Sequence, residues 1–122
     1  MAEEFSLKEI NRADPTNMTD MMRKHTPLVE IAGKVKAGQP FAVSLKVGGI
    51  DGVEHPNLLG HWINWVELYA GQRLLGRAEF APVVSQPEVT LTITLEEPAT
   101  LRVRASCNMH GLWESTQPIA FE

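Results

Sequence analysis

The stretch Val89-Thr90-Leu91-Thr92-Ile93-Thr94-Leu95 decides the fold class, because apolar side chains alternate strictly with threonines along it. A period of two is typical of a β-strand that turns one face toward a core and the other toward solvent. Valine, isoleucine and threonine also favour strands. The stretch therefore predicts a half-buried strand.

Two further segments on either side show the same period. Phe41–Val47 alternates large apolar with small or polar residues, and Leu101–Ala105 alternates apolar residues with arginines. Shorter candidate strands are Leu28–Ile31, Trp62–Tyr69, Leu74–Phe80 and Gln117–Phe121. Pairs such as Gly48-Gly49 and Asp51-Gly52 punctuate these segments as turns. About seven short strands joined by turns predict an all-β antiparallel sandwich.

Two parts of the chain are less clearly patterned. Trp62–Tyr69 also fits a helical stripe, but its aromatic content and the following turn at Gly71 favour a strand hairpin with Leu74–Phe80. Residues 1–24 are polar and are expected to form an N-terminal arm, with a short helical turn at Ser6–Asn11 and a helical spacing of methionines from Met18 to Met22. Residues 1–122 are expected to form a single domain.

The composition limits the function classes. The chain has 122 residues, 43% of them hydrophobic, which suffices for one core. A net charge of -4 argues against a general nucleic-acid binder. A single cysteine excludes an intrachain disulfide and fits a reducing compartment. The acidic N-terminus lacks signal-peptide features and no apolar run is long enough for a membrane span, so we expect a soluble cytoplasmic protein.

The residues that carry chemistry are four histidines and this cysteine, and all of them fall in loops or at segment ends. Continuing the alternation of Leu101–Ala105 by one step places Cys107 on the buried side, where a thiolate needs a compensating cation. His110 follows three residues later, at a spacing that can share one metal ion. His55 and His61 flank one short loop, and His25 opens the first strand region. Together they predict a metal site.

The ligand types narrow the choice of metal. Structural zinc usually takes more thiolates. Blue copper usually has a methionine soon after its second histidine, and none follows His110. Four imidazoles with one thiolate suit iron. Such a set can place the imidazoles in a plane with the sulfur axial, which leaves a sixth position open. A thiolate opposite an open site pushes electron density toward what binds there.

Three motifs resemble the superoxide reductase family, which comprises the neelaredoxins and the iron domain of desulfoferrodoxin. They are Lys24-His25-Thr26-Pro27, the segment from His55-Pro56-Asn57 through His61-Trp62 to Leu68, and Cys107-Asn108-Met109-His110-Gly111-Leu112-Trp113. The last run is highly specific, and the order of all five ligands agrees with the family.

The resemblance implies an immunoglobulin-like sandwich that holds one non-haem iron. The implied ligands are four equatorial histidines, His25, His55, His61 and His110, and the axial Cys107. The implied reaction reduces superoxide with one electron and two protons to hydrogen peroxide, without release of dioxygen. An electron donor, commonly rubredoxin, then reduces the ferric centre. The family also implies a homotetramer or homodimer.

Lys24 matches the catalytic lysine of the family. An ammonium beside an open site attracts a small anion and can hold a water that donates a proton.

The chain departs from the family pattern in two places. Many members have Glu-Lys-His where this chain has Arg23-Lys24-His25, so the carboxylate that closes the oxidised site is either absent or supplied by Glu30 or Asp20. Arg23 itself is a candidate to strengthen anion attraction. No cysteine precedes Cys107, so the four-cysteine domain of desulfoferrodoxin is expected to be missing.

Two other function classes remain open from the residues. One is an electron-transfer protein of the cupredoxin type, which four histidines and the missing late methionine disfavour. The other is a non-catalytic structural or carrier domain with zinc or no metal.

Overall fold

The computed structural model describes residues 5–122. Within this range it contains one short helix and eight strands, and the bounds of these elements are as follows. They are β1 (Asn11–Arg12), α1 (Asp20–His25), β2 (Pro27–Ile31), β3 (Phe41–Val47), β4 (Ile63–Ala70), β5 (Arg73–Glu79), β6 (Glu88–Ile93), β7 (Ala99–Cys107) and β8 (Gly111–Ile119).

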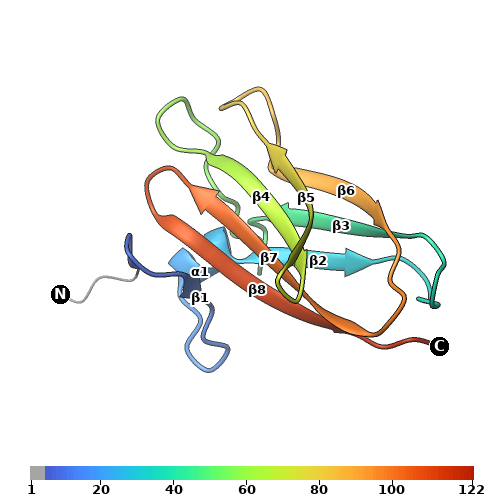
Figure 1. The fold of residues 1–122 in the computed structure, drawn as a ribbon. Helices are drawn as coiled ribbons and strands as arrows, with labels where there is room; N and C mark the ends of the chain where they lie inside the picture. Colours follow the sequence, from blue (N-terminus) through green and yellow to red (C-terminus); the bar gives the residue numbers. More distant parts are fainter. Residues whose placement is uncertain (1–4) are drawn as a thin grey trace.

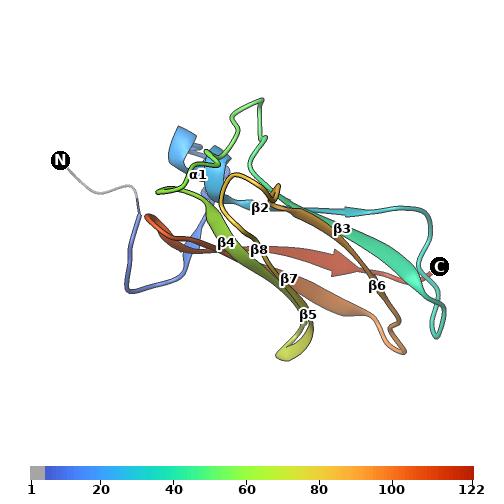
Figure 2. The ribbon, with the colours of Figure 1, turned by 90° about the horizontal axis from the view of Figure 1, so that it is seen from above.

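The strands form two sheets that face each other as separate layers (Figures 1 and 2). One sheet has the order β1-β8-β7-β4-β5 and the other the order β2-β3-β6. All neighbours pair antiparallel except β1, which pairs parallel with β8. The predicted all-β immunoglobulin-like sandwich is therefore confirmed, with seven longer strands and the two-residue β1 in the described range.

The core lies between the sheets and follows the predicted alternation. On β3, Phe41, Val43, Leu45 and Val47 are buried while the residues between them are partly exposed. On β7 the same pattern runs from Leu101 to Cys107. Because one face of each sheet is apolar, packing the two faces together removes both from water.

Strand β4 explains why its sequence also fitted a helical stripe. Its pairing register with β7 shifts between Ile63 and Trp65, and its pairing with β5 shifts between Leu68 and Tyr69. The buried residues therefore run Ile63, Val66, Leu68 rather than in strict alternation. A bulge adds one residue to the strand and so breaks the period of two. The strand hairpin with β5 is confirmed.

Strand β8 is longer than the predicted Gln117–Phe121, and it begins at Gly111. The prediction was wrong because the strand carries Glu114 at a buried position, where an apolar residue was expected. The carboxylate of Glu114 is held by Arg12 at 2.7 Å, Arg104 at 2.8 Å and Arg102 at 3.4 Å. Pairing of this kind lets a charged side chain occupy a buried position.

The expected helical turn at Ser6–Asn11 is also wrong. The Ser6 hydroxyl instead accepts hydrogen bonds from the backbone N–H groups of Lys8 and Glu9, which offers the backbone an alternative to a helix. Asn11 then joins β8 through β1. The methionine spacing does fall on a helix, α1, which Thr19 caps by accepting a hydrogen bond from Met22 N–H.

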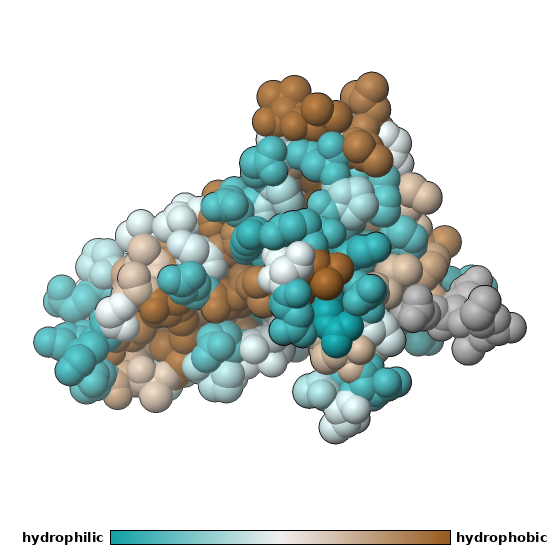
Figure 3. Space-filling model, turned by 180° about the vertical axis from the view of Figure 1, so that it is seen from behind, coloured by the Kyte–Doolittle hydropathy of each residue, from teal (hydrophilic) through white to brown (hydrophobic). Residues whose placement is uncertain are grey.

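Helix α1, the loop between β3 and β4, and the β7–β8 turn gather at one end of the sandwich (Figures 1 and 2). Seen from behind, one end of the molecule also carries a group of exposed apolar side chains (Figure 3). Among the described residues, none of the helices has the length and apolar character needed to cross a membrane.

Candidate metal centre

Four segments deliver the five predicted ligands to the same end of the sandwich. His25 is the last residue of α1, Cys107 is the last residue of β7, and His110 precedes β8 in the intervening turn. His55 and His61 lie in the loop between β3 and β4. One ligand atom from each of His25, His55, His61 and Cys107 lies within 4.8 Å of the others.

His110 completes this cluster. Its Nδ1 lies 3.7 Å from Cys107 Sγ, and its ring centroid lies 5.0 Å from that of His25 and 4.9 Å from that of His61. The structure thus brings together all five residues singled out in the sequence. We call these five residues the His/Cys cluster.

The histidine rings are oriented for ligation. The Nδ1 atoms of His25 and His55 lie within hydrogen-bond distance of the carbonyls of Met21 and Pro56. An Nδ1–H that donates to a carbonyl leaves Nε2 as an unprotonated acceptor. Nε2 of His25 and Nε2 of His61 are buried, and neither has a hydrogen-bond partner within residues 5–122. Two buried ring nitrogens without a partner, beside a thiol, are what a bound metal ion would satisfy.

Burial keeps the imidazoles in the form that binds a metal. Burial lowers the pKa of His25 to about 4 and that of His55 to about 3, and the neighbouring histidines add to the effect. Burial likewise lowers the pKa of His61 and of His110, and the charge of Lys24 contributes to both shifts. All four rings are therefore neutral at pH 7, as a ligand must be.

Cys107 was predicted to be buried, and its side chain is 3% exposed. Burial raises the pKa of its thiol, although the backbone N–H groups of Met109 and His110 act in the opposite direction by hydrogen bonding to the sulfur. The sulfur also lies 3.3 Å from Nε2 of His55. A cation in the cluster would favour the thiolate, and the backbone donors would then stabilise its charge.

A family model described as Desulfoferrodoxin matches residues 17–116, which include every residue of the His/Cys cluster. The chain belongs to the desulfoferrodoxin family. It is 30% identical over 117 residues to the neelaredoxin of Megalodesulfovibrio gigas, covering 81% of this chain and 88% of that protein. It is 33% identical over 101 residues to the superoxide reductase of Pyrococcus horikoshii, covering 75% of this chain and 84% of that protein.

Solved structures of this family have the same fold. A structure of a superoxide reductase (neelaredoxin) variant from Ignicoccus hospitalis superposes with a TM-score of 0.81 at 37% identity, covering 94% of this chain and 96% of that chain. The family's sandwich is thus shared along nearly the whole length of this chain.

Two aromatic residues, Trp113 and Phe5, pack against the ligand histidines of this desulfoferrodoxin-family site. Trp113 stacks on the His25 ring at 5.0 Å between centroids and donates its Nε1–H to the His110 carbonyl. Trp113 thus forms one wall of the site. The ring of Phe5 lies edge-on to His110 at 4.7 Å, a contact that no sequence signal indicated.

Gly48 is required by the position of His55. A Cβ at residue 48 would lie 2.6 Å from the backbone N of His55, and the residue has a φ of +93°. The Gly48-Gly49 pair predicted a turn in the sequence, but the close approach of His55 depends on the folded loop. Glycine meets both requirements, because it has no Cβ and adopts a positive φ without strain.

Asn108 links the two loops that carry ligands. Its Oδ1 accepts a hydrogen bond from Trp62 N–H at 2.8 Å, and its Nδ2 donates to the Gly60 carbonyl at 2.9 Å. These two backbone groups flank His61. No pattern in the sequence indicated this side-chain bridge.

The positive charges of Lys24 and Arg23 act on different groups. The positive charge of Lys24 contributes to the lowered pKa of His25, His61 and His110, so its ammonium lies near the cluster. Arg23 instead bonds the carboxylates of Asp20 and Asp51, each at 3.0 Å. Its charge is therefore balanced by two acids rather than directed at the cluster.

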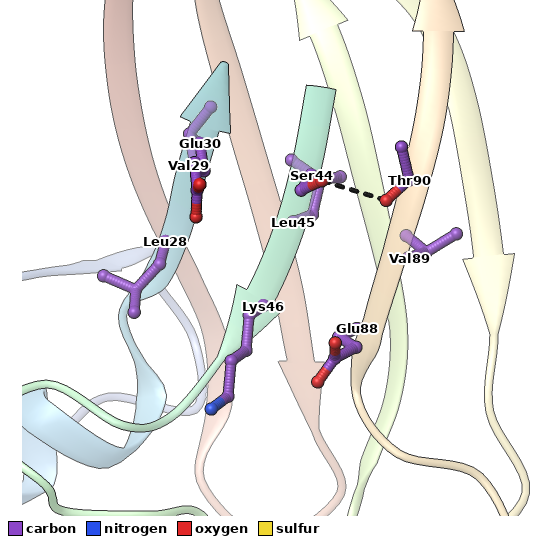
Figure 4. A pocket seen from close by; sticks show the side chains of 9 residues that line it. All are labelled: Leu28, Val29, Glu30, Ser44, Leu45, Lys46, Glu88, Val89 and Thr90. Atoms are coloured by element: carbon purple, nitrogen blue, oxygen red, sulfur yellow. Dashed lines mark hydrogen bonds between the residues drawn. The ribbon is translucent and has the colours of Figure 1, made fainter. Parts of the chain in front are cut away.

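Neither carboxylate suggested as a replacement for the family's glutamate belongs to the cluster. Asp20 is bonded to Arg23. Glu30 lies on the outer face of β2, where it lines a groove together with Ser44, Lys46 and Thr90 (Figure 4). That groove contains none of the cluster residues.

Proposed function

We propose that this chain is a superoxide reductase that converts superoxide to hydrogen peroxide by a one-electron reduction, with one iron held by His25, His55, His61, His110 and Cys107. The observation that carries the proposal is the His/Cys cluster itself, in which five donors from four segments converge and two buried Nε2 atoms have no partner among the described residues. Membership of a family that includes proteins named superoxide reductase supports the choice of substrate.

The donor set fits the proposed cofactor. Four neutral imidazoles and one thiolate combine borderline and soft ligands, whereas Mg²⁺ and Ca²⁺ take oxygen ligands. Iron bound there would supply the electron and an open coordination position for the anion. The protein contributes neutral rings, a desolvated sulfur and backbone donors that stabilise the thiolate.

Lys24 is proposed to attract the substrate and to assist proton delivery. Its positive charge contributes to the lowered pKa of His25, His61 and His110, which supports a location near the cluster. The chain as a whole carries a net charge of -4, which by itself repels an anion. A local cation therefore has to outweigh that field at short range. The same ammonium can hold a water that donates a proton.

Metal analysis with optical spectra of the purified protein tests the identity of the site. We expect one iron per chain and a thiolate-to-ferric charge-transfer band that appears on oxidation and is bleached by ascorbate. Zinc or copper in place of iron, with no such band, would refute the proposal. Dioxygen release during superoxide consumption would also refute it, because dismutation releases dioxygen and reduction does not.

The role of Lys24 is tested with Lys24→Ala, with Lys46→Ala as the matched control. Lys46 lies on β3 and its charge is already paired with the carboxylate of Glu54. We expect Lys24→Ala to lower the second-order rate with superoxide about tenfold and to reduce its salt dependence, at unchanged iron content. Equal rates for the two variants would show that Lys24 has no part in anion attraction.

A further inference from the structure

A group of exposed aliphatic side chains lies at one end of the molecule (Figure 3). Leu58 and Leu59 are 60% and 78% exposed, and Val83 and Val84 are 49% and 85% exposed. We call these four residues the aliphatic patch. Residues 55–66 and 80–87, which carry it, contain no Asp, Glu, Lys or Arg, although such residues make up 21% of the chain. An uncharged surface with four exposed large aliphatic side chains is typical of a contact site.

The two halves of the aliphatic patch are fixed to each other. The Asn57 side chain accepts a hydrogen bond from Val83 N–H at 2.7 Å and donates to the carbonyls of Val83 and Ser85. Val83 has a φ of +71°, which a β-branched residue rarely adopts. Because Asn57 bonds both backbone groups of Val83, the strained turn is held in place rather than relaxed.

The aliphatic patch shares a loop with the His/Cys cluster. Leu58 and His61 exchange two backbone hydrogen bonds, at 2.8 and 3.1 Å. Asn108 then ties Gly60 and Trp62 to the β7–β8 turn, where Met109 is 50% exposed. The patch is therefore connected through a few rigid contacts to the side of the cluster on which His61 and His110 are partly exposed.

We infer that the aliphatic patch is the docking surface for a small one-electron carrier protein that reduces the His/Cys cluster after each turnover, an inference that rests on the proposed function. In this step the carrier loses one electron and the oxidised centre gains it, with no bond formed or broken and no proton transferred. The sequence has one cysteine, so it cannot form a disulfide or a four-cysteine iron centre that would store the electron. Residues 1–122 supply no store for the electron that each turnover uses, so we assign its source to a separate protein that approaches the cluster closely.

The size and composition of the patch favour such a carrier over a second copy of this chain. A stable dimer usually buries some 20–30 residues on each side, whereas transient redox encounters use the smallest interfaces. Four aliphatic side chains on two uncharged loops match the second case. An uncharged contact also predicts that docking depends only weakly on salt, since little charge is brought together.

The double variant Leu59→Ser/Val84→Ser tests the inference, with reduced rubredoxin as the probe. It removes the two most exposed aliphatic side chains and leaves the Asn57 and Leu58 hydrogen bonds in place. Leu28→Ser/Leu74→Ser is the matched control, because both leucines are exposed on strands outside the two loops. Binding of oxidised rubredoxin to each protein, measured by NMR titration, provides a readout that is independent of turnover.

We expect the patch variant to bind rubredoxin at least fivefold more weakly and to be reduced by it five- to tenfold more slowly. Reduction by ascorbate and the rate with superoxide should equal those of the unmodified protein and the control. Absence of rubredoxin binding by the unmodified protein, or equal binding by all three proteins, would overturn the inference. Loss of an oligomer in the patch variant, seen by sedimentation, would also overturn it in favour of a second copy. If the unmodified protein does not consume superoxide, the proposed function fails, while the binding comparison still decides the docking.

Discussion

Asn108 is expected to hold His61 in position, so its removal should weaken metal binding as well as the fold. Asn108→Ala removes two hydrogen bonds, to Trp62 N–H at 2.8 Å and to the Gly60 carbonyl at 2.9 Å. Each such bond contributes about 0.5–1.5 kcal/mol, and exposed ones fall at the low end of that range. The free energy of unfolding should therefore fall by about 1–2 kcal/mol.

The effect on metal affinity is separable from the effect on the fold. With both flanking groups released, the His61 ring has to be ordered when the metal binds, and loss of such supporting contacts typically weakens metal affinity about tenfold. Urea denaturation of the metal-free protein measures the first quantity, and competition with a chelator measures the second. Asn108→Asp keeps the acceptor for Trp62 N–H, so its affinity should lie between those of Asn108→Ala and the unmodified protein.

Asn17→Ala is the matched control, because Asn17 is exposed and its side chain has no hydrogen-bond partner among the described residues. It should change neither quantity. If Asn108→Ala is destabilised yet binds metal as tightly as the unmodified protein, the reasoning is refuted. The backbone pair between Leu58 and His61 would then suffice to position the ring.

Three further predictions concern stability. In the metal-free protein, the folded pKa values of His25 and His55 (about 4 and about 3) lie below the unfolded value of about 6.5, so the unfolded chain binds more protons as pH falls below 6.5. The free energy of unfolding should drop by about 3 kcal/mol for each residue by pH 4, and urea titrations at pH 7, 5.5 and 4 that give one constant value would contradict this. Gly48→Ala should cost at least about 2 kcal/mol more in thermal unfolding than Gly52→Ala, since both have positive φ but only residue 48 would also clash with His55. Burial raises the pKa of Glu114, but hydrogen bonds from Arg104 and Arg12 outweigh it and hold the pKa below its usual value. That stability is lost as pH falls below about 4.5, so Glu114→Gln should cost about 2–3 kcal/mol at pH 7 and flatten the acid side of the urea profile.

The sequence was most informative where a side chain responds only to the face of its own strand. The bounds of β3 match the predicted Phe41–Val47, and the burial of Cys107 follows from the alternation that precedes it. The prediction failed at β8, because the burial of Glu114 depends on three arginines, one of them 102 residues away. Patterns of hydropathy do not contain such pairings.

In the site, too, local sequence predicted some features, whereas others depend on contacts between residues far apart in the chain. Residue type and local motif sufficed to select the five members of the His/Cys cluster, since few side chains bind metals and all of them lay at segment ends. The contacts that hold these ligands were not predictable. Asn108 acts on a loop 46 residues away, and the need for glycine at position 48 arises only when the loop folds back on His55.

The position of the cluster at the end of the core gives it two unlike sides. Cys107 ends the buried alternation of β7 and is 3% exposed, so the sulfur belongs to the low-dielectric side. His61 and His110 are partly exposed, the charge of Lys24 acts on both, and His61 lies in the loop that carries Leu58 and Leu59 of the aliphatic patch. A small anion drawn by a single ammonium and a carrier held by uncharged side chains would use different forces on neighbouring surfaces. Raising the salt concentration should therefore slow the reaction with superoxide while leaving reduction by the carrier nearly unchanged, and an equal response of both rates would contradict this separation.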